Sequence, residues 1–178
     1  MYIIIAQIIG ILGMLMNVLS YQRRKKRDII IMQLFGSIFF SVNMFMLNAM
    51  MGGLLNLIGI FRAVVYSNRE KLRGIKIWNT VFIALYALSY VVVFTLLAKP
   101  VTPFNLICEL LPLVGMIATT LSFATTSASL VRKFALISSP AWLIYNCLNF
   151  ALGGIICEVM SLISVAISIY RFDRQCRR

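Results

Sequence analysis

Residues 2–27 read YIIIAQIIGILGMLMNVLSYQRRKKR, an apolar run that ends abruptly in the basic stretch Arg23–Arg27. The run is as long as the roughly 17–25 residues that an α-helix needs to cross a bilayer core of about 30 Å. Its positive charges follow the apolar residues, whereas a cleavable signal peptide carries its charges in front of them. We therefore expect this segment to be retained as a transmembrane helix.

Further apolar segments follow the first one along the whole chain. The chain is 61% hydrophobic and has a mean hydropathy of +0.94, which is more apolar surface than a soluble domain of 178 residues could bury. The sequence therefore predicts an all-α integral membrane protein with seven transmembrane helices. The predicted spans are 2–21, 29–48, 53–67, 77–97, 103–124, 134–152 and 154–170.

The basic residues are distributed asymmetrically between the connections. Fifteen of the 17 Lys and Arg residues follow the first, third, fifth and seventh spans. The alternate connections carry only Lys99, and Arg62 lies inside the third span. Because short basic loops stay in the cytoplasm, we predict an N-terminus outside the cell and a cytoplasmic C-terminus.

Composition argues against several other classes of protein. The net charge of +12 sits in short loops beside apolar spans, so topology explains it and we expect no nucleic-acid partner. The chain has no histidine and only five acidic residues, which leaves little material for a metal site or acid–base catalysis. We expect no enzyme activity, no metal and no cofactor. Cys108, Cys147, Cys157 and Cys176 show no CxxC spacing and are expected to be free thiols.

Seven spans allow the chain to consist of two three-helix copies with the same orientation in the membrane, separated by one additional span. The first and fifth spans run in the same direction, so spans 1–3 and 5–7 match if span four inverts the chain between them. We therefore expect a single membrane domain over 1–178, with three-helix repeats at 1–68 and 103–172 and a linker helix at 77–97.

Short motifs support the repeat without fixing its register. Asn48–Gly53 and Asn149–Gly154 both read Asn-x-x-x-Gly-Gly at an expected outer turn, 101 residues apart. Gly10 and Gly115 lie at similar places in the first and fifth spans, and the longer basic loop of the first copy would absorb the difference in spacing.

The third span carries Leu55-Asn56 followed by Arg62. With these residues the whole chain resembles the small bacterial inner-membrane YgjV family, which implies a multi-pass protein of the bacterial inner (plasma) membrane. The arrangement of three, one and three spans also resembles the SWEET and PQ-loop superfamily. That second resemblance implies two parallel three-helix repeats with a solute pocket between them.

In SWEET-type repeats, a Trp in the second span precedes a pocket Asn in the third by about 16 positions. Here Trp142 is followed after 16 positions by Glu158, and Phe40 by Asn56, which implies a repeat offset of 102. By this resemblance one pocket Trp and one pocket Asn would be retained, and Phe40 and Glu158 would be replacements. The Pro-Gln pair of the superfamily is absent, and the carboxylate argues against a sugar as the solute.

Charged side chains are costly inside a membrane, so Arg62, Glu109 and Glu158 are candidate functional residues. Each has a plainer alternative. Arg62 could snorkel to the inner interface, Glu109 could be a hydrated residue of a first helical turn, and Glu158 could favour a helix N-terminus. The sharper hypothesis is an Arg62–Glu158 charge pair that acts as a counter-ion or gate, with Glu109 or Glu158 available for proton coupling.

We interpret the sequence as a transporter for a small polar solute that works by alternating access between the two repeats. Asn56, Trp142, Asn146 and Glu158 are the predicted substrate-binding residues. The alternative is a non-transporting membrane receptor or interaction protein with the same fold. A water-accessible pocket favours the first reading and a sealed core the second. The lipid bilayer and the solute are the expected partners, and a homo-oligomer stays open.

Overall fold

A computed structural model describes residues 1–20, 26–67, 74–125 and 127–170. These residues form seven α-helices and no strand, which confirms the predicted all-helical membrane fold. The helices are α1 (Tyr2–Ser20), α2 (Lys26–Met46), α3 (Met50–Ser67), α4 (Ile75–Thr95), α5 (Pro103–Ala124), α6 (Ala128–Leu148) and α7 (Leu152–Ser168).

Local sequence signals fix several of these helix ends. Pro103 opens α5, and the hydroxyl of Thr102 accepts a hydrogen bond of 3.2 Å from the amide of Asn105. Ser127 caps α6 in the same manner, by accepting from the amide of Leu130. Gly74 precedes α4 with a φ of 80°, a left-handed conformation that glycine adopts without a Cβ clash.

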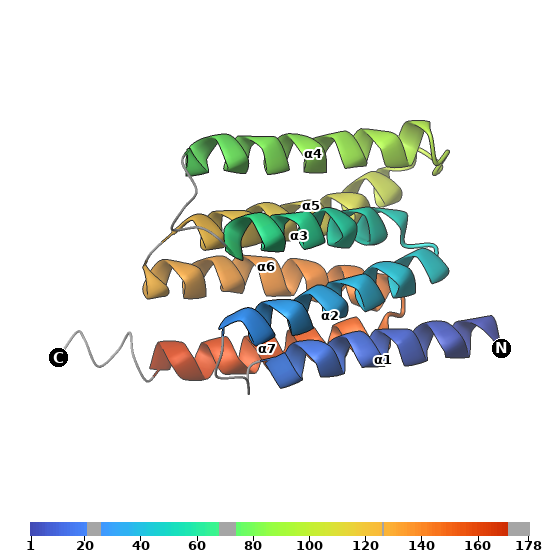
Figure 1. The fold of residues 1–178 in the computed structure, drawn as a ribbon. Coiled ribbons are helices and arrows are strands. Elements are labelled where there is room, and N and C mark those ends of the chain that lie inside the picture. Colours follow the sequence, from blue (N-terminus) through green and yellow to red (C-terminus); the bar gives the residue numbers. More distant parts are fainter. Residues whose placement is uncertain (21–25, 68–73, 126, 171–178) are drawn as a thin grey trace.

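Consecutive helices run antiparallel and form one bundle (Figure 1). Within each half of the chain α2 packs on α1 and α3, and α6 packs on α5 and α7. The halves meet where α1 contacts α7 and where α3 contacts α5. Helix α4 packs mainly on α3 and α5 and forms one edge of the bundle.

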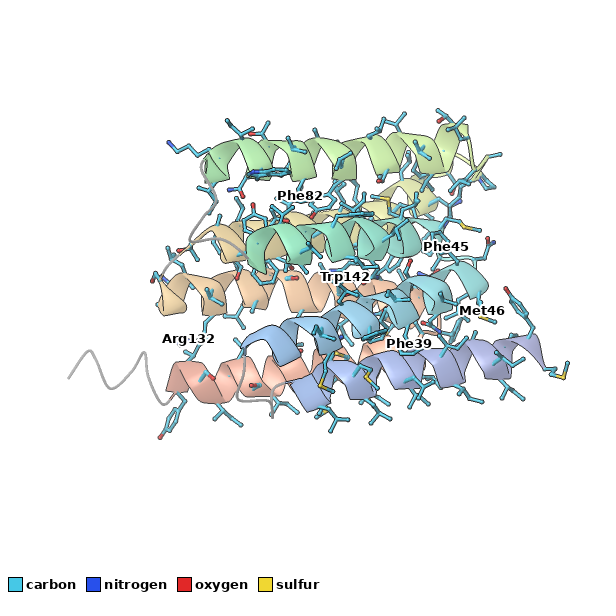
Figure 2. All side chains as sticks on the ribbon, viewed as in Figure 1. Phe39, Phe45, Met46, Phe82, Arg132 and Trp142 are labelled. Carbon is cyan, nitrogen blue, oxygen red and sulfur yellow. The ribbon has the colours of Figure 1, made fainter. Side chains whose placement is uncertain are left out.

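The exterior of the bundle is apolar and its interior holds polar side chains. Large hydrophobic residues such as Ile8, Leu88 and Ile163 are exposed, whereas Asn43 and Thr120 are fully buried. Figure 2 shows apolar side chains along the outward faces of the helices. By length and composition α1, α4 and α5 can each cross a bilayer, and α2, α3 and α7 contribute the shorter apolar stretches Leu34–Met46, Met50–Tyr66 and Leu152–Ser168. This distribution suits a hydrocarbon solvent.

The helix ends that flank the basic connections lie at one end of the bundle (Figure 1). Lys76 lies in the first turn of α4 there, and Arg132 and Lys133 lie in the first turns of α6. The other basic loop residues belong mostly to segments 21–25, 68–73 and 171–178, outside the described residues. We call this the basic-loop end and the opposite one, which holds Met1, the N-terminal end.

A constant offset of 102 residues relates α1–α3 to α5–α7. Helix α6 covers the same positions as α2 plus 102, and α7 begins at the position of α3 plus 102. The turns agree as well: Asn48 and Phe150 both have a positive φ, 60° and 53°. The backbone hydrogen bond from Ala49 to Met44 likewise recurs from Ala151 to Asn146. We call α1–α3 repeat one and α5–α7 repeat two.

Packing between the helices follows the same offset. A Cβ on Gly13 would lie 3.3 Å from the Phe40 ring and 3.2 Å from the Gly36 carbonyl. A Cβ on Gly115 would lie 2.6 Å from the Trp142 ring and 3.4 Å from the Ser138 carbonyl. Each of these partners stands 102 residues after its counterpart.

The structure therefore corrects two points of the sequence-based register. Gly115 corresponds to Gly13 and not to Gly10. The spacing from this glycine to the turn after the second helix is therefore the same in both repeats, and no difference in loop length is needed to explain it. The two Asn-x-x-x-Gly-Gly motifs are out of step by one residue, because Gly52 corresponds to Gly154. The division into 1–68, 77–97 and 103–172 has limits that lie partly outside the described residues and stays a prediction.

Candidate functional site

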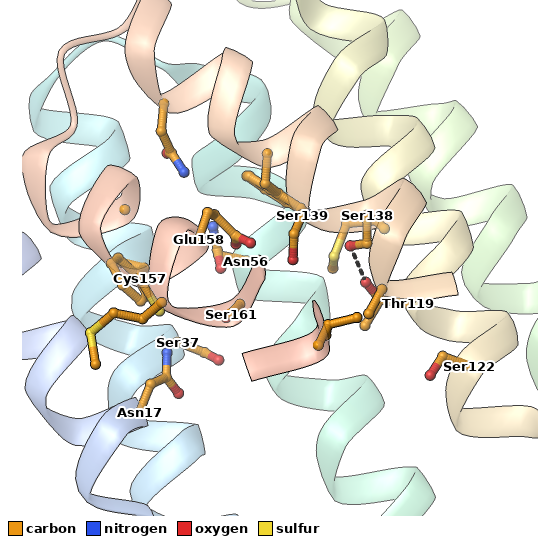
Figure 3. Close-up of a pocket in the computed structure, with 18 of the residues that line it drawn as sticks. Asn17, Ser37, Asn56, Thr119, Ser122, Ser138, Ser139, Cys157, Glu158 and Ser161 are labelled. Atoms are coloured by element: carbon orange, nitrogen blue, oxygen red, sulfur yellow. Dashed lines mark hydrogen bonds between the residues drawn. The ribbon is translucent and has the colours of Figure 1, made fainter. Parts of the chain in front are cut away.

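A cavity of about 690 Å³ lies between the two repeats (Figure 3). Helices of both halves line it, and hydroxyl, amide and carboxylate groups make up much of its wall. Six pairs of lining residues are equivalent under the offset of 102. They are Asn17 and Thr119, Ser37 and Ser139, Phe40 and Trp142, Met44 and Asn146, Asn56 and Glu158, and Arg62 and Ser164. The cavity thus lies where the repeats face one another across their pseudo-symmetry.

The cavity brings together all four predicted substrate-binding residues. Asn56, Trp142, Asn146 and Glu158 line it, from α3, α6 and α7. Arg62 lines it as well, whereas Glu109 does not. The roles assigned to these residues from the sequence stay predictions.

Glu158 lies on the cavity wall, with the Ser139 side chain within hydrogen-bonding reach (Figure 3). Its side chain is partly exposed, and no basic group of the described residues lies within 4.0 Å of its carboxylate. Ser161 and Ser164 follow on the same wall at intervals of three residues. This helical spacing from Glu158 could have revealed both serines in the sequence.

Asn146 and Trp142 are held in place by glycines of neighbouring helices. Asn146 is 2% exposed, and a Cβ on Gly154 would lie 2.6 Å from its side chain. Its Oδ1 atom accepts no hydrogen bond, although it is buried. The indole of Trp142 lies against Gly115 and meets the ring of Tyr145 edge-on, with the centroids 6.0 Å apart.

The serines of α6 are site residues that the sequence did not single out. Ser138 and Ser139 are buried, and Ser138 exchanges a hydrogen bond of 2.7 Å with Thr119 of α5 (Figure 3). Ser138 also donates to the Gly115 carbonyl at 3.0 Å. Adjacent serines inside an apolar segment were the available signal, because each hydroxyl needs a partner within the membrane.

The predicted Arg62–Glu158 ion pair is not formed. The Arg62 guanidinium donates instead to the hydroxyls of Thr120 and Tyr86, at 3.2 and 3.4 Å, and approaches the Met116 carbonyl at 3.5 Å. It also lies over the Phe123 ring, 5.0 Å from the centroid. Arg62 is 7% exposed and therefore does not snorkel to an interface. Its side chain joins α3 to α4 and α5.

Glu109 is also not the hydrated residue that its place near the start of α5 suggested. It is 1% exposed and forms an ion pair with Lys99 from the α4–α5 connection. The Tyr145 hydroxyl donates to its second carboxylate oxygen at 3.2 Å and accepts from the Gly52 amide at 3.1 Å. Because that amide lies in the first turn of α3, it has no partner within its own helix.

A related contact lies between α1 and α7. The Gln7 side chain donates to the Phe150 carbonyl at 2.6 Å and accepts from the Leu152 amide, in the first turn of α7, at 3.1 Å. Close by, a Cβ on Gly153 would overlap the Gly10 carbonyl and lie 2.8 Å from the Ile11 amide nitrogen. At the N-terminal end, the first turn of α3 thus donates a hydrogen bond to Tyr145 of repeat two, and the first turn of α7 donates one to Gln7 of repeat one.

Comparison with known proteins gives one match. The sequence matches the family model Imp-YgjV, described as bacterial inner membrane protein, over residues 4–176. No curated protein and no solved structure matches the chain.

Proposed function

Since the chain belongs to the Imp-YgjV family of bacterial inner membrane proteins, we propose that it transports a small polar solute by alternating access between its two repeats. The cavity lined by equivalent residues of both repeats carries this proposal. The solute crosses unchanged, so the proposal includes no catalytic step and no cofactor.

The size and chemistry of the cavity support a small solute. Its volume of about 690 Å³ lies within the range of about 300–1,000 Å³ that is typical of small-molecule sites. Helix–helix contacts alone would favour a filled core, because protein interiors are close-packed. Polar groups around an open space inside a membrane bundle are typical of a solute pathway.

The cavity lining and several contacts support one closed and one accessible end. The cross-repeat contacts of Gln7, Tyr145 and Gly153 lie at the N-terminal end, whereas Arg62 joins α3 to α5 nearer the basic-loop end. The cavity lining extends the other way, toward Asn17 and Ser164 near the basic-loop ends of α1 and α7. With the predicted topology, this conformation would face the cytoplasm and be closed to the outside.

Alternating access requires the N-terminal contacts to break while the basic-loop end closes. Each neutral hydrogen bond contributes only about 0.5–1.5 kcal/mol net, so a few such contacts can hold one conformation without locking it. The similarity of the two repeats provides a physical route to the opposite state. In that state each repeat would adopt the arrangement that the other repeat has in this conformation.

Cys157 offers a native probe for this proposal because it lines the cavity. In a variant with Cys108, Cys147 and Cys176 replaced by alanine, we expect a charged, membrane-impermeant thiol reagent to label Cys157 from the cytoplasmic side. Labelling from the outside should be slower. Absence of labelling from both sides in a folded protein would indicate a sealed core and favour the receptor alternative.

Transport itself is tested with purified protein in liposomes. Thermal-shift screening against amines, amino acids, nucleosides and sugars identifies a ligand by mass-action stabilisation of the folded protein. That ligand should then cross the membrane faster in proteoliposomes than in protein-free liposomes. A ligand that binds within the cavity but is not carried across would contradict the proposal.

A further inference from the structure

Three charged side chains lie within the described helices near the cavity, and Glu158 is the carboxylate among them without a basic partner in the described part of the chain. Glu109 is neutralised by Lys99, whereas Arg62 donates from one guanidinium nitrogen to the oxygens of Tyr86, Met116 and Thr120 and its buried Nε has no acceptor. Glu158 faces the cavity with no basic group of the described residues within 4.0 Å. A carboxylate in this setting favours a positively charged ligand, because opposite charges attract strongly where little water screens them.

A second acceptor lies on the same cavity wall. The Oδ1 atom of Asn146 is buried and receives no hydrogen bond from the protein. Leaving such an oxygen unpaired is unfavourable, so a rotation of the Asn146 amide that turns Oδ1 toward a donor in the cavity would be favoured. After that rotation Glu158 and Asn146 would form an acceptor pair, which suits the several N–H donors of an ammonium group.

The aromatic wall fits the same ligand. Trp142 lines the cavity, and its indole is the aromatic ring that attracts cations most strongly. Its edge-on contact with Tyr145 and its packing on Gly115 fix the orientation of the ring. The serine hydroxyls of α7 supply further acceptors at Ser161 and Ser164.

We propose that the cavity binds a small organic cation whose primary ammonium group contacts Glu158 beside the Trp142 indole, with the Asn146 amide rotating to accept from it. This assignment deepens the proposed transport function and rests on it for its physiological meaning, but it concerns binding alone. The assignment gives Arg62 no contact with the ammonium group, because its guanidinium is itself positively charged.

Binding can be followed by the fluorescence of a single tryptophan. The chain has two tryptophans, and Trp78 is 36% exposed on α4, away from the cavity lining. In Trp78→Phe, Trp142 is therefore the only indole reporter. The probes are ethanolamine and its uncharged counterpart ethylene glycol, together with glycine amide and zwitterionic glycine.

We expect ethanolamine and glycine amide to change the Trp142 emission, and ethylene glycol to have no effect at the same concentration. Glu158→Gln should weaken amine binding by about tenfold or more, because a charge-assisted contact is replaced by a neutral one. Melting of each variant in detergent controls for folding. Equal binding of the amine and the glycol, or unchanged amine affinity in Glu158→Gln, would overturn the proposal, as would tighter binding of glycine than of its amide.

The repeat supplies a charge-relocation control. Asn56 is the counterpart of Glu158 in repeat one and also lines the cavity. The double variant Asn56→Glu, Glu158→Asn keeps one carboxylate in the cavity but moves it to the equivalent position. We expect it to bind ethanolamine more tightly than Glu158→Asn alone. No recovery in a folded double variant would contradict the charge-based assignment.

Binding and flux results separate this proposal from the transport proposal. If amines bind in a Glu158-dependent manner but do not cross proteoliposome membranes, the cation assignment stands and transport is refuted. If an uncharged solute crosses while amines neither bind nor compete, transport stands and the cation assignment is refuted.

Discussion

Gln7 and Glu109 stand 102 residues apart, at equivalent positions of α1 and α5. Each stabilises the first turn of the third helix of the opposite repeat, which is α7 for Gln7 and α3 for Glu109. Gln7 accepts directly from the Leu152 amide of α7. Glu109 acts through the Tyr145 hydroxyl, which accepts from the Gly52 amide of α3. Amides of a first helical turn lack intrahelical partners, so these contacts stabilise the helix starts and join the repeats at once.

Tyr145→Phe should loosen the N-terminal end. It leaves the Gly52 amide without its acceptor and removes one donor from buried Glu109, a loss of about 1–3 kcal/mol. We expect Cys157 to become more accessible to a charged thiol reagent from outside the cell. Tyr90→Phe is the matched control, because its hydroxyl donates to the Leu106 carbonyl between α4 and α5. Equal effects of the two substitutions would contradict a gating role.

Gly153→Ala should be the most disruptive glycine substitution at the α1–α7 contact. The added methyl group would overlap the Gly10 backbone, which cannot move aside as a flexible side chain can. We expect a loss of about 1–3 kcal/mol or more, measured as a lower melting temperature in detergent. At Gly59 a Cβ would meet only the Met116 methyl group, at 3.2 Å, so Gly59→Ala should have little effect. Comparable losses at both positions would refute the close approach of α1 and α7.

The packing of Gly115 on Trp142 predicts a coupled pair. Gly115→Ala should destabilise the protein, because its Cβ would lie 2.6 Å from the indole. Adding Trp142→Phe should recover part of that loss, since the equivalent Gly13 leaves 3.3 Å beside Phe40. Melting temperatures of the two single variants and the double variant give the coupling energy. Additive losses would show that the two positions do not share one packing constraint.

Arg62 should couple to α5 and not to Glu158. We expect Arg62→Met and Glu158→Gln to change stability additively, within about 0.5 kcal/mol, because the two side chains form no ion pair. Arg62→Met and Thr120→Val should be non-additive, since a 3.2 Å hydrogen bond joins these residues. A double-mutant cycle in detergent measures both couplings. A coupling to Glu158 larger than that to Thr120 would restore the charge-pair hypothesis.

The charge distribution predicts the orientation of the whole bundle. A reporter that is active only in the cytoplasm should be active when fused after Arg178. A fusion in the α4–α5 connection, near Lys99, should be inactive with the same reporter. Activity in the reverse pattern would overturn the predicted orientation and place the N-terminal end of the bundle in the cytoplasm.

The sequence by itself determined the apolar spans and pointed to four residues of the cavity wall. The predicted segments 2–21 and 103–124 agree closely with α1 and α5, because the length and apolarity of a span follow from the thickness of the bilayer. Asn56, Trp142, Asn146 and Glu158 converge on one cavity for a related reason. Polar residues in a membrane helix turn inward, so their inward position is decided before any tertiary contact is known.

Only the tertiary structure decided the partners and the register. Arg62 can reach in several directions, and the acceptors of α4 and α5 draw it away from Glu158. Glu109 can be buried because Lys99 of the α4–α5 connection forms an ion pair with it. The position of Lys99 depends on how the chain turns after α4. The sequence was compatible with offsets of both 101 and 102, because apolar segments resemble each other at many alignments. The backbone hydrogen bonds at the two turns decide the offset. The bond from Ala49 to Met44 and the bond from Ala151 to Asn146 match at 102 residues and at no neighbouring offset.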